Sequence, residues 1–151
     1  MLRSAATASV LQARCSAISP RRDNPASYGT ALEAYRAIAF DGALDASGRL
    51  AVAFRIGRTL EKLRRYDEAV EQYYAQVVVA YRDGRAKGEN FDDDARAAFS
   101  RAAFRLADEF ESRGREEQAV GVLRLVAASD VPAAEEAARR LERISRKGRF
   151  L

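Results

Sequence analysis

The pattern that most constrains this chain is a tyrosine–alanine–tyrosine signature with helical spacing. Its members stand three and then four residues apart, so they lie on one face of a helix. The copies are Tyr28, Ala31 and Tyr35, then Tyr66, Ala69 and Tyr73, and a weaker third copy at Glu116, Ala119 and Leu123. A signature that recurs in this way predicts a fold built from stacked repeats of one helical unit.

The amino-acid composition favours a single all-α domain. The chain has 151 residues, of which 48% are hydrophobic, and this is enough for one domain with a buried core. It has three prolines and no tryptophan, it is rich in Ala, Arg, Glu and Leu, and it contains no run of alternating β-branched residues. No segment has the roughly 18 uncharged apolar residues that a membrane span requires. The composition therefore predicts an all-α protein without a membrane span.

Helix-forming segments alternate with turn residues along the chain. Helices are expected over residues 4–18, 27–40, 46–63, 66–81, 92–112, 116–129 and 132–147. Residues 19–26 contain two prolines and are predicted to be a linker, while residues 83–90 contain two glycines and several charges and are predicted to be a loop. The three aspartates at 92–94 are expected to cap a helix, because consecutive aspartates lack the alternate spacing of a calcium loop.

The apolar positions of two predicted helices keep a common register. Similar residue types within 46–63 and 92–112 are separated by 50 residues, and the register continues into the helix that follows each. The first set is Ala53, Ile56, Gly57, Leu60 and Ala69, and the second is Ala103, Leu106, Ala107, Phe110 and Ala119. Gly57 and Ala69 are small, as expected where the two helices of one hairpin approach closely.

This spacing resembles the tetratricopeptide repeat, a helix-turn-helix unit of about 34 residues, most clearly over residues 51–81. The resemblance implies an all-α, right-handed α-solenoid of stacked antiparallel helical hairpins, with about three repeats and a closing helix over residues 27–147. Residues 1–26 would then form an N-terminal helix and linker, and residues 148–151 a tail. The chain departs from the family pattern at Ala53 and Ala103, where a tryptophan is common, and has the repeat-end proline only at Pro132.

The resemblance further implies a non-catalytic scaffold that binds a protein or an extended peptide in a groove lined by the first helix of each hairpin. The family's lysine and asparagine clamp for a terminal carboxylate is not matched, since phenylalanines, Arg58 and Asp108 stand at the corresponding positions. Arg55, Arg58 and Lys62 share one helix face and could receive an acidic segment. The candidate partner-binding residues are Phe54, Arg55, Arg58, Lys62, Arg101, Phe104, Arg105 and Asp108.

Other interpretations of the same residues remain open. The basic face could be an ordinary solvated surface paired with nearby carboxylates, and Phe54 and Phe104 could belong to the core. The chain could instead be a structural subunit of a larger assembly, for example in the cell envelope, whose repeats stack on neighbouring subunits or on further copies of itself.

The positive charge of the chain lies at its two ends. The net charge is +4, but residues 1–26 carry +3 and residues 139–151 carry +5, so the intervening residues carry −4. A short basic tail such as Arg146, Lys147 and Arg149 binds phosphates weakly and without sequence preference. We therefore do not expect a nucleic acid to be the partner.

The residue inventory also argues against catalysis. The chain has no histidine, which removes the usual general base and zinc ligand, and its one cysteine, Cys15, cannot form an intramolecular disulfide. No Ser-x-x-Lys pairing or phosphate-binding loop is present. We expect neither an enzyme, a cofactor nor a small-molecule substrate. Residues 1–22 contain no acidic residue, as in a transit or secretory leader, but Arg14 interrupts their apolar part. A cytoplasmic location is therefore expected, with an exported or cell-envelope protein as the alternative.

Overall fold

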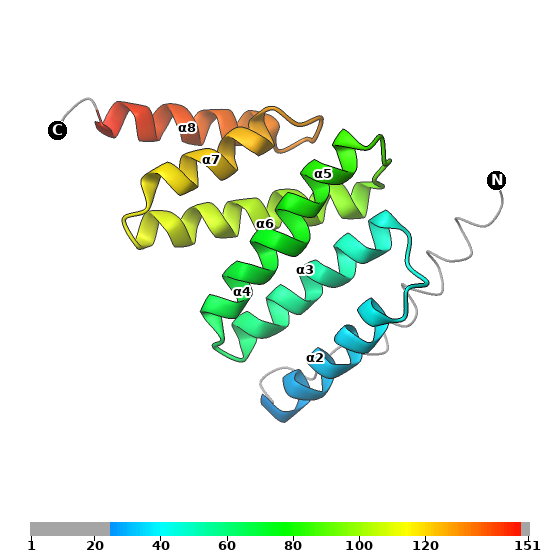
Figure 1. The fold of residues 1–151 in the computed structure, drawn as a ribbon. Helices are drawn as coiled ribbons and strands as arrows, with labels where there is room; N and C mark the ends of the chain where they lie inside the picture. The colour runs from blue at the N-terminus through cyan, green and yellow to red at the C-terminus, as the bar shows by residue number, and fades with distance from the viewer. Residues whose placement is uncertain (1–24, 149–151) are drawn as a thin grey trace.

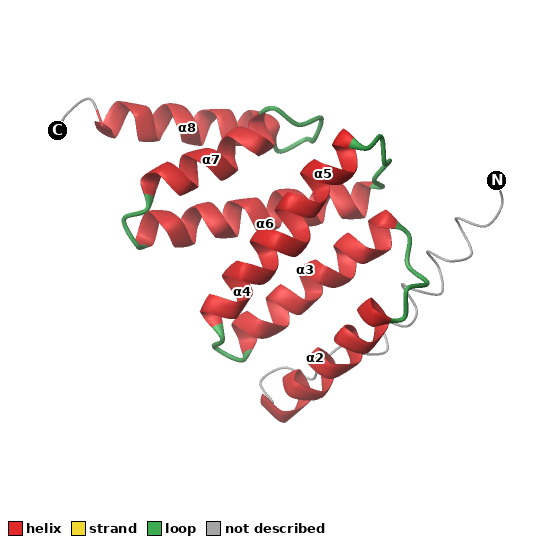
Figure 2. Cartoon of the chain, viewed as in Figure 1, coloured by secondary structure: helices red, strands yellow, loops and turns green. Residues whose placement is uncertain are grey.

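The computed structural model describes residues 25–148, and every regular element within them is helical (Figures 1 and 2). The predicted helix over 4–18 and the tail residue Arg149 lie outside the described residues. Six helices follow one another: α2 (Pro25–Phe40), α3 (Ala46–Lys62), a long helix made of α4 (Tyr66–Tyr73), η1 (Tyr74–Val79) and α5 (Ala80–Ala86), then α6 (Asp93–Ser112), α7 (Glu116–Ala127) and α8 (Ala134–Gly148). The prediction of an all-α protein is confirmed.

Neighbouring helices in the sequence pack against each other. Contacts join α2 to α3, α3 to α4, α6 to α7 and α7 to α8, and α3 also packs against α6. Figure 1 shows that successive helices run in opposite directions, with α2 at one end of the molecule and α8 at the other. The α3–α6 contact therefore joins the half formed by α2–α5 to the half formed by α6–α8. Among residues 25–148, no helix is long and apolar enough to span a membrane.

Aspartates fix where the two central helices begin. The Asp45 carboxylate accepts a hydrogen bond of 2.7 Å from the backbone N–H of Gly48, and the Asp92 carboxylate accepts one of 2.8 Å from that of Ala95. Each bond satisfies one of the N–H groups that a helix leaves unpaired at its start. The prediction that the aspartates at 92–94 serve to cap a helix is confirmed for Asp92.

The helix that begins at Tyr66 is longer than the sequence predicted. It continues through Ala86, so the predicted loop at 83–90 is wrong in its first half, and the connection to α6 occupies only residues 87–92. Gly84 suggested a helix end, but its role is packing, because a Cβ atom there would lie 2.7 Å from Cζ of Phe91 and 2.5 Å from Oε2 of Glu89. The missing side chain allows the connection to fold back over α5.

One continuous apolar core runs from α2 to α8. Of the residues predicted to define the repeats, Tyr66, at 50%, and Glu116 are exposed, and Tyr28 is half-buried. Tyr66 opens α4 directly after an exposed turn, so its ring lies at the edge of the molecule. The buried members of that set are Ala31, Tyr35, Ala53, Ile56, Gly57, Leu60, Ala69, Tyr73, Ala103, Leu106, Ala107, Phe110, Ala119 and Leu123.

Helices α3 and α4 approach each other closely at Gly57. A Cβ atom on Gly57 would lie 2.3 Å from Cε1 of Tyr73, which is too close for any side chain. Glycine is therefore required where the Tyr73 ring crosses α3. This geometry agrees with the expectation that Gly57 is small because the two helices of this hairpin approach each other closely.

Candidate functional site

The most distinctive surface feature is a groove of about 510 Å³ whose floor is α3 and whose walls come from α2 and α6. We call it the α2–α3–α6 groove. Its charged and aromatic lining consists of Tyr28, Tyr35, Phe54, Arg55, Arg58, Lys62, Asp94 and Arg101. Because α3 packs against both α2 and α6, the face of α3 that lines the groove lies between these two helices.

The groove brings together cations that have no carboxylate partner. Arg55, Lys62 and Arg101 form no ion pair with any residue that the structure describes, and Arg58 makes only a long contact of 3.7 Å between Nε and Oε2 of Glu61. Asp94 is the single acidic residue in the lining. The lining therefore has an excess of positive charge, although the segment between residues 27 and 138 is acidic as a whole.

Spacing along the helices explains why these side chains meet. Arg55, Arg58 and Lys62 are three and four residues apart on α3, so they follow one face, and Thr59 lies on the same face. The hydroxyl of Thr59 donates a hydrogen bond of 2.8 Å to the backbone carbonyl of Arg55, so that donor is already satisfied. Arg101 completes the set from the first half of α6.

Aromatic rings supply the apolar part of the groove. Phe54 is half-buried and its ring lies 5.7 Å from that of Tyr73, which passes behind α3. Burial raises the pKa of the Tyr73 hydroxyl, and the negative charge of Glu61 raises it further, so the phenol stays neutral. That hydroxyl is buried and makes no hydrogen bond of ordinary geometry with the described residues. Phe54 is thus held from behind while its exposed part faces the groove.

Five of the eight predicted partner-binding residues line this groove, and Phe104, Arg105 and Asp108 do not. Arg140 lies over the Phe104 ring at 4.6 Å from its centre and donates a hydrogen bond of 2.7 Å to Asp108. Arg105 donates to both carboxylate oxygens of Glu61 at 2.8 Å. These three side chains therefore join α6 to α8 and to α3, and they lie outside the α2–α3–α6 groove.

The sequence did not identify three of the charged and aromatic groove residues. It indicates only a packing role for Tyr28 and Tyr35 and only a helix start for Asp94, yet all three line the groove. The signal for Tyr28 was present in the chain, since Tyr28 and Tyr35 are seven residues apart and share a face of α2. Nothing in the sequence placed Asp94 near α3, because that proximity arises from the packing of α3 against α6.

The described residues hold no candidate metal centre, either in the groove or elsewhere. Within residues 25–148, no group of three or more Asp, Glu, Cys or His side chains is arranged to hold an ion. The chain matches no protein-family model, and no curated protein or solved structure is significantly similar to it.

Proposed function

We propose that this chain is a non-catalytic protein-interaction domain of the tetratricopeptide-repeat type, and that the α2–α3–α6 groove binds an acidic, extended segment of a partner protein. The observation that carries the proposal is the convergence of three unpaired cations, Arg55, Lys62 and Arg101, on one groove. The repeated hairpin geometry at α3–α4 and α6–α7 supports the fold assignment. Each of these pairs is joined by a short turn, and the buried residues of the two pairs keep the register of 50 residues.

Charge decides what kind of segment fits. A cation without a carboxylate nearby keeps its water shell, and a partner carboxylate replaces that water with a charge-assisted hydrogen bond. Phe54 and Tyr28 offer half-buried aromatic surface beside these cations, which suits a partner segment that alternates acidic and apolar side chains. An extended chain presents its side chains alternately, so one edge can contact Arg55 and Lys62 while the other contacts the rings.

The test uses a fluorescently labelled synthetic peptide of alternating glutamate and leucine, titrated with the protein and followed by fluorescence anisotropy. We expect binding that weakens as salt is added, and about a tenfold loss of affinity for Arg55→Glu, Lys62→Glu and Arg101→Glu, each tested singly. The matched control is Arg124→Glu, because Arg124 is exposed on α7, has no ion pair with the described residues and lies outside the groove.

Two outcomes would contradict the proposal. One is equal affinity for the groove variants and for Arg124→Glu, which would place binding elsewhere. The other is equal binding of a peptide in which lysine replaces glutamate, which would remove the role of charge. The three cations are exposed, so we expect each variant to keep its helices. Circular dichroism of each variant checks this.

A further inference from the structure

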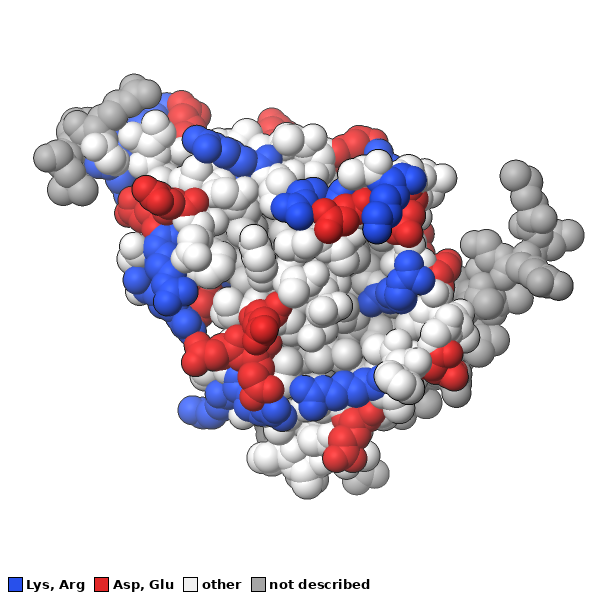
Figure 3. Space-filling view, in the orientation of Figure 1, with Lys and Arg blue, Asp and Glu red and all other residues white. Residues whose placement is uncertain are grey.

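A second groove lies between α4 and α7 and shares no lining residue with the first. It encloses about 800 Å³, and we call it the α4–α7 groove. Its floor is apolar and consists of Val70, Tyr74, Val122 and Leu125, of which Tyr74 is 47% exposed. Tyr66 and Tyr74 are eight residues apart with the half-buried Val70 between them, so α4 and the first residue of η1 present an apolar stripe on this side of the molecule. Figure 3 shows an uncharged surface over this part of the molecule.

A glycine in the middle of α7 opens the wall of this groove. Gly121 is exposed, and a Cβ atom built on it would meet no atom within 4 Å. Glycine is among the least favourable residues inside a helix, and here the chain's own packing does not require it. In contrast, Gly57 and Gly84 are each required by a side chain that occupies the space. The bare backbone at Gly121 leaves room for atoms from outside the chain.

The two edges of the groove carry opposite charge. Asp67 and Glu71 lie on the α4 edge, and Arg113 and Arg115 lie on the edge formed by the α6–α7 turn. Figure 3 shows acidic atoms over the start of α4 and basic atoms over that turn. Asp67 and Arg113 already pair across one end of the groove at 2.9 Å. Glu71 and Arg115 form no ion pair with the residues that the structure describes.

We propose that the α4–α7 groove is a self-association surface in which two copies of this chain pack about a two-fold axis. A two-fold axis that lies in the interface plane and runs along the groove brings the acidic edge of one copy onto the basic edge of the other, and does so twice. Glu71 of each copy then meets Arg115 of the other, while Tyr74 of each copy fills the space above the other's Gly121. Self-association requires that the two edges of the groove carry opposite charges, so that each edge can meet the other edge of a second copy. Binding of an unrelated protein does not require this balance, so the charge arrangement favours a second copy.

Charge exchange provides the main test, with molar mass measured by sedimentation equilibrium from micromolar to millimolar protein. The wild type is expected to rise from the mass of one chain towards that of two. Glu71→Arg and Arg115→Glu should each weaken association about tenfold, because each places like charges together at two equivalent contacts. The double variant Glu71→Arg/Arg115→Glu should restore it, whereas the control Arg124→Glu should leave it unchanged.

Gly121→Leu separates association from folding. Because a side chain at this position meets no atom of the chain, the variant should fold with an unchanged or higher Tm, and it should fail to associate because leucine occupies the space assigned to Tyr74. Binding of the acidic peptide should be unaffected, since the α2–α3–α6 groove is distinct. A wild-type mass of one chain over the whole concentration range would overturn the proposal, as would a charge-exchanged double variant that associates no better than either single variant.

Discussion

At the scale of single residues, the two hairpin turns share the same backbone hydrogen bond but carry different residues at their left-handed position. In the α3–α4 turn, the N–H of Arg65 donates to the carbonyl of Leu60 at 2.9 Å, and in the α6–α7 turn the N–H of Arg115 donates to that of Phe110 at 2.7 Å. The residue before each donor has a positive φ, of 58° at Arg64 and 70° at Gly114. Glycine adopts this conformation without strain, whereas a side chain does not. The same turn is therefore strained at Arg64 and relaxed at Gly114.

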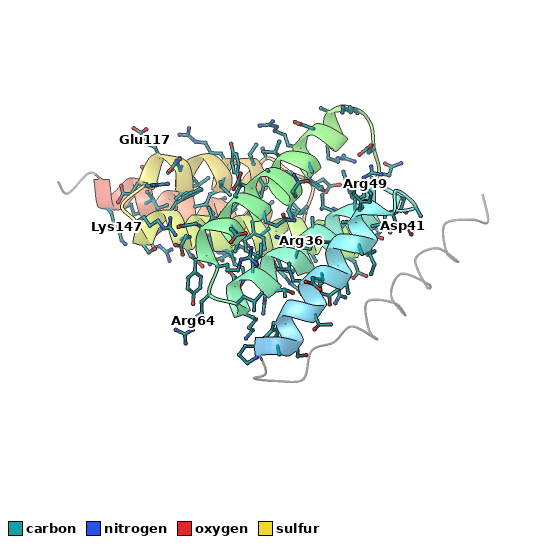
Figure 4. All side chains as sticks on the ribbon, turned by 60° about the horizontal axis from the view of Figure 1, so that its bottom comes forward. Arg36, Asp41, Arg49, Arg64, Glu117 and Lys147 are labelled. Carbon is teal, nitrogen blue, oxygen red and sulfur yellow. The ribbon has the colours of Figure 1, made fainter. Side chains whose placement is uncertain are left out.

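Arg64→Gly should stabilise the protein. The side chain forms no ion pair with the described residues, and Figure 4 shows it pointing away from the body of the molecule, so little is lost by removing it. We expect the free energy of unfolding to rise by about 0.5–1 kcal/mol, which is the relief of left-handed strain less the extra entropy of glycine in the unfolded chain. Urea denaturation measures the change. The reciprocal variant Gly114→Ala should lose a similar amount, and a lower stability of Arg64→Gly would contradict this account.

At the scale of elements, the π-helical segment η1 keeps one face of a long helix buried. Ala69 and Tyr73 are four residues apart, as in an α-helix, but both Val77 and Val78 are fully buried and Tyr81 follows them on the same side. An unbroken α-helix would turn Val78 well away from Tyr73, because each residue advances about 100°. The wider turn of a π-helix compensates for one extra residue and returns the later side chains to the core.

Deletion of Gln76 should therefore be tolerated. Gln76 is exposed within η1, and its removal allows a regular α-helix to place Val78, Tyr81 and Gly84 on the face that they already occupy. We expect a loss of no more than about 1 kcal/mol in the free energy of unfolding. Deletion of Arg101, which is exposed within the regular helix α6, should instead rotate Leu106, Ala107 and Phe110 out of the core and prevent folding. Circular dichroism and thermal denaturation distinguish the two, and equal damage from both deletions would refute the role assigned to η1.

Some features of the helices follow from the local sequence pattern, whereas others depend on tertiary packing. Apolar spacing placed α3, α6 and α7 correctly, and the register of 50 residues matches the equivalent turns at Arg64 and Gly114. Local pattern did not predict η1, because two adjacent buried valines fit either helix type, nor the continuation of α5 past Gly84, because the side chain that fills its space comes from Phe91. Basic spacing on α3 identified half of the groove. The other half depends on which residues of α2 and α6 reach α3, and only tertiary packing decides that.

At the scale of the whole molecule, the half containing α2–α5 meets the half containing α6–α8 where α6 packs against α3, α4 and η1. The Tyr81 ring stacks on that of Phe99 with 4.0 Å between centres, and the hydroxyl of Ser47 accepts a hydrogen bond of 2.9 Å from the backbone N–H of Asp92. Glu61 and Arg105 add a doubly hydrogen-bonded ion pair between α3 and α6. Such contacts between the two halves determine whether they unfold together.

The Glu61–Arg105 pair should therefore contribute more than an ordinary surface ion pair. Their side chains are 22% and 40% exposed, so the pair is partly shielded from water, and two charge-assisted bonds hold it. A double-mutant cycle with Glu61→Ala and Arg105→Ala, measured by urea denaturation, should give a coupling energy of about 1 kcal/mol. The pair Glu136–Arg139 within α8 is more exposed and serves as the reference, and a smaller coupling energy is expected for it. If both cycles give the same coupling, the Glu61–Arg105 pair adds nothing beyond local charge attraction. The cohesion of the two halves must then come from their other contacts, namely the apolar packing of α6 on α3 and η1 and the stacking of Tyr81 on Phe99.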